Sequence, residues 1–179
     1  MRELSLHILD ALENSLEAGA SRVTLTIEED LTADRLTITI TDNGRGMDAE
    51  TVKTVLDPFF TTRTTRHVGL GLPLFAAAAK RCNGDLTIES EVGRGTTVQA
   101  TFQHSHIDRA PLGDIHDSLL SFLLAERAVD LHYVHRVNGR QFEFDTADIR
   151  AELGDVPLSH PAVREWLSEF ISEGEREIK

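Results

Sequence analysis

Acidic and amide side chains gather near the start of the sequence. Asp10 and Asn14 are four residues apart, and Glu13 lies between them. In a helix, positions four apart share a face, so Asp10 and Asn14 would point the same way with a second carboxylate nearby. These side chains could simply form the solvated side of a helix. If a later segment indicates a Mg²⁺ site, they could instead be ligands, since this cation prefers oxygen ligands.

A second polar stretch, Asp42-Asn43-Gly44-Arg45-Gly46-Met47, follows a segment of alternating hydrophobicity. An aspartate at the end of a strand, beside flexible residues, can accept a hydrogen bond from an exocyclic amine. The sequence Asp-Asn-Gly also forms an Asx turn readily. Both interpretations remain open at this level.

A third stretch, His67-Val68-Gly69-Leu70-Gly71-Leu72, leads into an apolar, alanine-rich segment. Two glycines allow a backbone to approach a ligand, and the N–H groups at the start of the following helix suit a phosphate. A tight turn that serves helix packing is the alternative. The preceding segment, 59–67, is the most cationic stretch of the chain and could close over an anion.

The hydrophobic pattern predicts the elements that position these stretches. Helical spacing predicts helices over 4–18, 48–56, 75–82, 114–128, 146–153 and 161–171. Alternation predicts strands over 22–28, 36–40, 86–88, 98–102, 131–137 and 140–144. Asn138-Gly139 indicates a type I′ turn between the last two strands. The chain is therefore of the α/β class.

Composition narrows the class of partner. The net charge is −12, and no basic stripe with interleaved aromatic residues occurs, which argues against nucleic acid and against a phospholipid surface. A single cysteine, Cys82, excludes an internal disulfide and a zinc ribbon. The sequence has neither a membrane-spanning apolar run nor a signal-like N-terminus, so we expect a cytoplasmic protein.

Taken together and in this order, five motifs resemble the GHKL family of ATP-binding proteins, which includes type II topoisomerases, Hsp90-like chaperones, sensor histidine kinases and mismatch-repair ATPases. The segment 10–20 resembles the N box, and its sequence is most similar to that of the mismatch-repair branch. Residues 42–47, 57–63, 68–72 and 93–96 resemble the G1, F, G2 and G3 boxes. The resemblance implies a two-layer α/β sandwich over residues 1–105 that binds ATP and Mg²⁺.

The resemblance also implies roles for single positions. The nucleotide-binding residues would be Asn14, Asp42, Gly44, Gly46, Met47, Phe59, Arg63, Gly69, Leu70, Gly71, Leu72 and Thr96. Asn14 would help to hold Mg²⁺, and Asp42 would accept from the adenine amino group with support from the Thr96 hydroxyl. The segment 59–67 would form a lid over the nucleotide.

One departure from the family pattern concerns catalysis. Where the hydrolysing branches carry a glutamate four residues before the asparagine, this chain has Asp10, which is one methylene shorter. A misplacement of about 1 Å can cost about 100-fold in rate, so hydrolysis is expected to be slow unless Glu13 substitutes. Asp10 and Glu13 are thus the candidate catalytic residues.

A second departure concerns the phosphoacceptor. The N box begins almost at Met1, which leaves no room before it for the helical hairpin that carries the phosphoacceptor histidine of sensor kinases. His7 lies among apolar neighbours, so we expect a structural role for it. Autophosphorylation of the usual kind is therefore not expected.

Residues 106–179 lie beyond the resemblance and predict a small α+β region of a helix, a hairpin and two further helices. Its apolar faces need burial, either on the ATP-binding sheet or on another subunit, and a homodimer is one option. His104 and His106, with Asp108 and His116 nearby, could bind a metal, although surface or packing roles are the simpler expectation. Residues 169–179 are expected to be a fraying, solvated helix end.

The leading hypothesis is a stand-alone regulatory ATP-binding protein that phosphorylates an unidentified protein partner or hydrolyses ATP slowly. The main alternative is a non-catalytic interaction module that ATP switches. A mismatch-repair-like ATPase would need a basic DNA-binding surface, which the charge of −12 disfavours.

Overall fold

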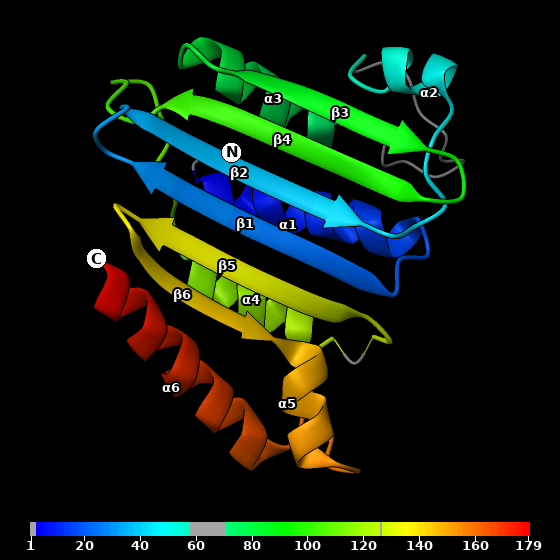
Figure 1. The fold of residues 1–179 in the computed structure, drawn as a ribbon, viewed down its shortest axis with the longest axis vertical. Coiled ribbons are helices and arrows are strands. Elements are labelled where there is room, and N and C mark those ends of the chain that lie inside the picture. Colours follow the sequence, from blue (N-terminus) through cyan, green and yellow to red (C-terminus); the bar gives the residue numbers. More distant parts are fainter. Residues whose placement is uncertain (1–2, 58–70, 126) are drawn as a thin grey trace.

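The computed structural model describes residues 3–57, 71–125 and 127–179 (Figure 1). In this part of the chain, the helices are α1 (Leu4–Glu17), α2 (Ala49–Thr54), α3 (Gly71–Arg81), α4 (Ile115–Leu123), α5 (Thr146–Leu153) and α6 (Pro161–Ile178). The strands are β1 (Arg22–Asp30), β2 (Arg35–Asp42), β3 (Asp85–Glu91), β4 (Gly95–Gln103), β5 (Asp130–Val137) and β6 (Arg140–Asp145). They form one mixed sheet of order β3-β4-β2-β1-β5-β6.

The sheet and its helices make two layers, as the α/β prediction required. Helices α1, α3 and α4 lie behind the sheet in Figure 1, and α1 contacts both of the others. Leu4, Ile8 and Leu12 on one face of α1 are fully buried, and each contributes about 1.5–3 kcal/mol of burial free energy. On the strands, buried aliphatic residues alternate with threonines and charged residues that face away from the helices.

The C-terminal region extends the same sheet. Strand β5 pairs with β1 in parallel, with Leu25 opposite Tyr133, and β6 pairs with β5 in antiparallel fashion. Helix α4 connects β4 to β5, and β2 and β1 lie between these two strands in the sheet. The apolar faces of this region are therefore buried largely on the same sheet. The domain boundary at residue 105 remains a sequence prediction. It lies between β4 and β5, which belong to one continuous sheet.

The largest differences from the predicted boundaries are at the ends of two helices. The helix predicted over 114–128 ends at Leu123, and the helix predicted over 161–171 continues to Ile178. The charged segment 169–179 is not a solvated end, because Ile171, Gly174, Glu175 and Ile178 continue the buried stripe of α6. The high charge of the segment hides this stripe, whose only charged member is Glu175.

His7 occupies the interface between α1 and α3. Its ring is 4 % exposed and stacks on Phe75 with 5.1 Å between ring centroids. Burial lowers the pKa of His7 to about 4, with further lowering by the chain's N-terminal charge and by Arg81. Among the described residues, Nδ1 of His7 has no hydrogen-bond partner. These contacts are those of a packing residue.

Candidate functional site

A pocket of about 420 Å³ opens between α1, the ends of β2 and β4, and the loop that follows β2. Its apolar wall includes Ile40, Val55, Leu72 and Val98. Its polar lining is Asn14, Ser15, Glu17, Asp42, Arg45, Asp48, Thr51 and Thr96. An apolar slot with a few convergent polar groups is the usual form of a small-molecule site.

Asp42 ends β2 and presents its carboxylate to the pocket. Its Oδ1 accepts from the backbone N–H of Gly44 at 2.8 Å, and its Oδ2 accepts from the hydroxyl of Ser15 at 2.8 Å. The hydrogen bond from Gly44 is the Asx turn that the sequence left as one alternative, and Asp42 also lines the pocket, as the other alternative requires. Each carboxylate oxygen has a second acceptor position for a ligand donor.

Three polar residues lie side by side across neighbouring strands at this end of the sheet. Thr96 of β4 lies opposite Asp42 of β2 and opposite Ser90 of β3. The Thr96 hydroxyl is 2.8 Å from Ser90 Oγ, which also accepts from the backbone N–H of Met47 at 2.8 Å. Ser90 thus joins the loop after β2 to the β3–β4 hairpin and fixes one wall of the pocket.

Glycine is required at two points of this wall. A Cβ at Gly46 would overlap the carbonyl of Glu91, and a Cβ at Gly95 would overlap the carbonyl of Asp42. Both glycines also have positive φ angles, of 71° and 123°. The backbone of the loop and the hairpin can approach this closely because neither residue carries a side chain.

The loop after β2 is also fastened to α1. Arg45 donates its backbone N–H to the carbonyl of Ala18 at 2.9 Å, and its guanidinium donates to the carbonyl of Glu17 at 2.9 Å. Helix α2 then begins with Asp48 as its N-cap, whose carboxylate accepts from the N–H of Thr51. That hydrogen bond lowers the pKa of Asp48.

The pocket brings together about half of the predicted nucleotide-binding residues. Its lining includes Asn14, Asp42, Gly46, Met47, Leu72 and Thr96. Gly44 and Gly71 are not part of the lining. The N–H of Gly44 donates to the carboxylate of Asp42, and Gly71 is the first residue of α3. The predictions at Phe59, Arg63, Gly69 and Leu70 fall outside the described residues.

The two candidate catalytic carboxylates have different surroundings. A Cβ built on Gly71 would lie 3.6 Å from Oδ2 of Asp10, so this carboxylate faces the start of α3. Glu13 instead accepts from Arg127 at 2.6 Å, in the connection between α4 and β5. Neither residue is part of the pocket lining.

Ser15 and Ser90 are site residues that the sequence reasoning missed. Ser15 follows Asn14 directly, and the helical spacing that groups Asp10 with Asn14 does not distinguish it from a packing serine. Ser90 occupies the same face of β3 as the apolar Leu86 and Ile88. This break in an otherwise apolar face was the available signal.

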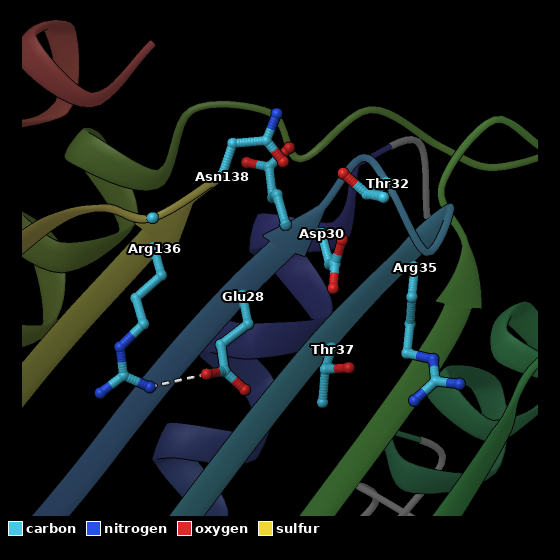
Figure 2. A pocket seen from close by; sticks show the side chains of 9 residues that line it. Glu28, Asp30, Thr32, Arg35, Thr37, Arg136 and Asn138 are labelled. Atoms are coloured by element: carbon cyan, nitrogen blue, oxygen red, sulfur yellow. Dashed lines mark hydrogen bonds and ion pairs between the residues drawn. The ribbon is translucent and has the colours of Figure 1, made fainter.

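A second hollow lies on the open face of the sheet, near the β1–β2 hairpin (Figure 2). It measures about 680 Å³ and contains charges of both signs, including Glu28, Asp30, Arg35 and Arg136. Arg136 donates to Glu28 at 2.6 Å across neighbouring strands. The charges of this pair balance each other, and the remaining charged residues of the lining are Glu29, Asp30 and Arg35.

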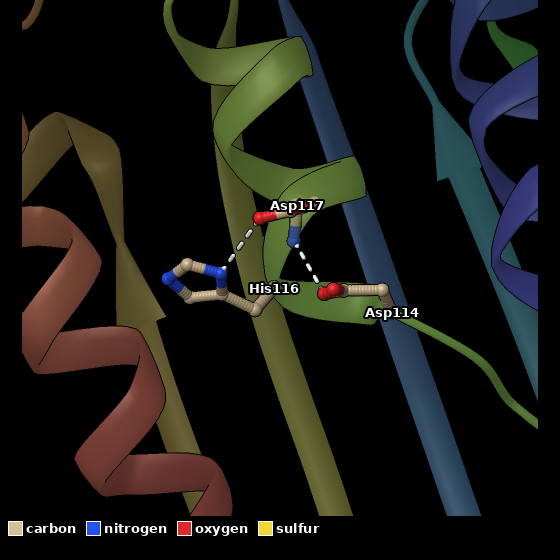
Figure 3. A group of neighbouring side chains, drawn as sticks. All are labelled: Asp114, His116 and Asp117. Carbon is tan, nitrogen blue, oxygen red and sulfur yellow. Dashed lines mark hydrogen bonds and ion pairs between the residues drawn. The ribbon is translucent and has the colours of Figure 1, made fainter.

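The histidines considered for a metal site have separate environments. His104 contacts Glu29, and Nδ1 of His106 accepts from the N–H of Asp108. His116 lies with Asp114 and Asp117 at the start of α4, the one such cluster among the described residues (Figure 3). There Asp114 caps the helix and His116 Nε2 lies 3.0 Å from Ser168, so local contacts account for the cluster.

The described residues contain no helix that is both long and apolar enough to cross a membrane.

Comparison with known proteins gives matches for the segment that forms the pocket. Residues 2–106 match the family described as histidine kinase-, DNA gyrase B- and HSP90-like ATPases. Sporulation kinase C of Bacillus subtilis is 34% identical over 97 residues, which cover 54% of this chain and 22% of that protein. Sensor protein kinase FleS of Pseudomonas aeruginosa is 38% identical over 110 residues, which cover 62% of this chain and 27% of that protein.

The fold also resembles a solved structure described as the N-terminal domain of a DNA repair protein. The TM-score is 0.56 at 14% identity, and the match covers 80% of this chain and 52% of that one. At this identity the likeness concerns the fold alone. The chain spans about a quarter of the length of the two kinases.

Proposed function

This chain belongs to the family of histidine kinase-, DNA gyrase B- and HSP90-like ATPases, and we propose that its pocket binds ATP with the adenine on Asp42. The carboxylate of Asp42, held by Ser15 and Gly44 inside the pocket, carries this proposal. An ionised carboxylate only accepts hydrogen bonds, so it favours a base edge with an exocyclic amine. Adenine offers this amine where hypoxanthine offers a carbonyl.

Mg²⁺ is the cofactor that best fits the polar side of the pocket. Asn14, whose side chain carries an amide oxygen, lines the pocket, and Asp10 lies one turn earlier on the same face of α1. Hard oxygen donors in small number suit Mg²⁺, which retains several waters. When bound, the ion would neutralise the charge of the phosphates. We propose that Asn14 holds it.

Of the two candidate general bases, we favour Asp10. Its carboxylate faces the start of α3, where free helix N–H groups suit a phosphate. Glu13 instead contacts Arg127, in the connection between α4 and β5. Asp10 would accept the proton from an attacking water or from the hydroxyl of a protein substrate.

The reaction that we propose is transfer of the γ-phosphate to an unidentified protein partner, or slow hydrolysis. The kinase relatives support transfer. The alternative is an interaction module that ATP switches without turnover. An association of two copies through residues 106–179 is a further proposal, although much of the apolar surface of that region is already buried on the sheet.

Calorimetric titration with ATP tests the binding proposal. Asp42→Asn replaces an acceptor by an amide that also presents N–H donors to the base, so we expect a loss of at least tenfold in affinity. The matched control is Asp30→Asn, because Asp30 also ends a strand and accepts a backbone N–H, from Ala33. Unchanged affinity in a folded Asp42→Asn variant would remove the pocket assignment.

Incubation with γ-labelled ATP then separates the enzyme from the switch. Steady phosphate release, or label on an added candidate partner, that falls in Asp10→Asn but not in Glu13→Gln supports Asp10 as the base. Tight binding without release or transfer supports the switch. Equal activity of the wild type and Asp10→Asn would show that Asp10 has no catalytic role.

A further inference from the structure

A buried cluster of charged side chains joins β1, β5 and α6. The side chain of His135 is 0 % exposed and lies between two carboxylates. Its Nε2 is 2.9 Å from Oε1 of Glu29, and its Nδ1 is 2.8 Å from Oε2 of Glu175. A neutral imidazole has one N–H, so only the doubly protonated ring can donate to both carboxylates.

The groups around this cluster support the same charge state. The hydroxyl of Tyr133 donates to Oε1 of Glu175 at 2.7 Å, and Lys179 Nζ lies 3.8 Å from Oε2 of Glu175. On the other side, His104 Nε2 lies 2.8 Å from Oε2 of Glu29. These are the titratable and charged groups that face the cluster from the described elements, and the hydrogen bonds from His135 and His104 hold the pKa of Glu29 well below its usual range.

Helix α6 reaches the cluster because its last turns lie very close to the sheet. A Cβ at Gly174 would overlap the ring of Phe142 on β6, so the helix approaches the strand at a residue without a side chain. The next residue, Glu175, is 5 % exposed and turns its carboxylate toward His135. Ile171 and Ile178 are buried on either side.

The loss of one partner from such a cluster is costly. A buried ion pair adds little when intact, but removal of one charge leaves the other buried and uncompensated. A neutral His135 would present a ring lone pair to one of the two carboxylates. Loss of the proton from His135 would therefore weaken the contact of Glu175 on α6 with β5, and that of β5 with Glu29 on β1.

We propose that Glu29, His135 and Glu175 form a protonation-controlled latch, which holds the C-terminal half of α6 on the sheet while His135 is charged and releases it when His135 loses its proton.

The direction of the pH effect follows from the surroundings of His135. Burial lowers its pKa, but the hydrogen bonds to Glu175 and Glu29 and their charges outweigh burial and raise the pKa above 6.5. The hydrogen bond from His135 is the main reason that the pKa of Glu29 falls to about 2. The latch is thus at full strength below pH 6.5 and weakens as the pH rises through the folded-state pKa of His135.

Hydrogen exchange of the backbone amides of α6, measured by NMR on the full chain between pH 6 and 9, tests the latch. After correction for intrinsic exchange, the protection of wild-type α6 should fall above pH 6.5, by up to about tenfold per pH unit while opening releases one proton, and should level off above the folded-state pKa of His135. His135→Gln should lack this slope. His132→Gln is the matched control, since His132 lies on the same strand and contacts Glu143 at 2.6 Å on the open face.

The ring of His135 gives a second readout that needs no variant. We expect two ring N–H signals for His135 at pH 6.5, because its pKa is raised above this ordinary value. A neutral ring at that pH, or α6 protection in the wild type that stays flat from pH 6.5 to 9, would overturn the proposal. If His135→Gln does not fold, the ring signals and the wild-type slope decide the question.

Discussion

The hydroxyl of Ser15 donates to Oδ2 of Asp42 over 2.8 Å and so connects the last turn of α1 to the end of β2. Because Gly44 binds the other carboxylate oxygen, the plane of the carboxylate is fixed before a ligand enters. Preorganised groups of this kind reduce the cost of ligand binding.

Removal of this hydroxyl should therefore weaken nucleotide binding. Ser15→Ala is expected to lower ATP affinity by about tenfold, which corresponds to about 1.4 kcal/mol and is typical of a hydrogen bond to a charged group. Calorimetric titration measures the effect. Ser5→Ala is the control, because Ser5 is equally buried on α1 but lies outside the pocket. Equal affinities in the two variants would show that Ser15 does not position Asp42.

The close approach at Gly46 predicts a large loss of stability on substitution. Gly46→Ala and Gly93→Ala both place a side chain at a positive φ, 71° and 81°, which costs about 1–2 kcal/mol. A Cβ at Gly93 meets open space, whereas a Cβ at Gly46 overlaps the Glu91 carbonyl. Urea unfolding should show a loss for Gly46→Ala at least about twice that for Gly93→Ala. Similar losses would mean that the loop can move away from Glu91 easily.

The lowered pKa of His7 predicts that the protein loses stability in acid. Its folded-state pKa of about 4 lies below the ordinary 6.5, so the unfolded chain binds the proton more readily and stability falls as the pH decreases from 6.5 towards 4. His7→Phe keeps an aromatic ring against Phe75 and removes the proton site. The unfolding free energy of His7→Phe minus that of the wild type should therefore increase from pH 7.5 to pH 4.5. A difference that stays constant would contradict the pKa of His7.

Most of the fold could be predicted from the sequence because its signals are local. The apolar stripe of α1, the alternation in β1 and β2, and the Asn138-Gly139 turn each define an element without reference to the rest of the chain. Asn138 and Gly139 have φ angles of 47° and 84°, as a type I′ turn requires.

The arrangement of the C-terminal region was harder to predict from the sequence. Nothing local specifies that β5 pairs in parallel with β1, since that contact joins residues about 108 positions apart, such as Leu25 and Tyr133. The burial of Glu175 was missed for a related reason. A glutamate in a charged segment looks solvated until its partners, His135 and Tyr133, are known from the tertiary structure.

In the candidate site, too, the residues marked by local motifs could be predicted, and those that act through tertiary contacts could not. Asp42 and Asn14 could be chosen from motifs, because their roles depend on positions along the chain. Ser15 and Ser90 act through contacts across elements, with Asp42 in one case and with Met47 and Thr96 in the other. Such contacts appear only once the register of β2, β3 and β4 is known.

The central claim is that Asp42 recognises the adenine amine, and a comparison of ATP with inosine 5′-triphosphate on the wild-type protein tests it most directly. The two nucleotides share their ribose and phosphates and differ at the base edge that would face Asp42. We predict that calorimetric titration will show at least about tenfold weaker binding of inosine 5′-triphosphate, because its carbonyl would face the carboxylate. Equal affinity for the two nucleotides would contradict the assignment of Asp42 as the adenine contact.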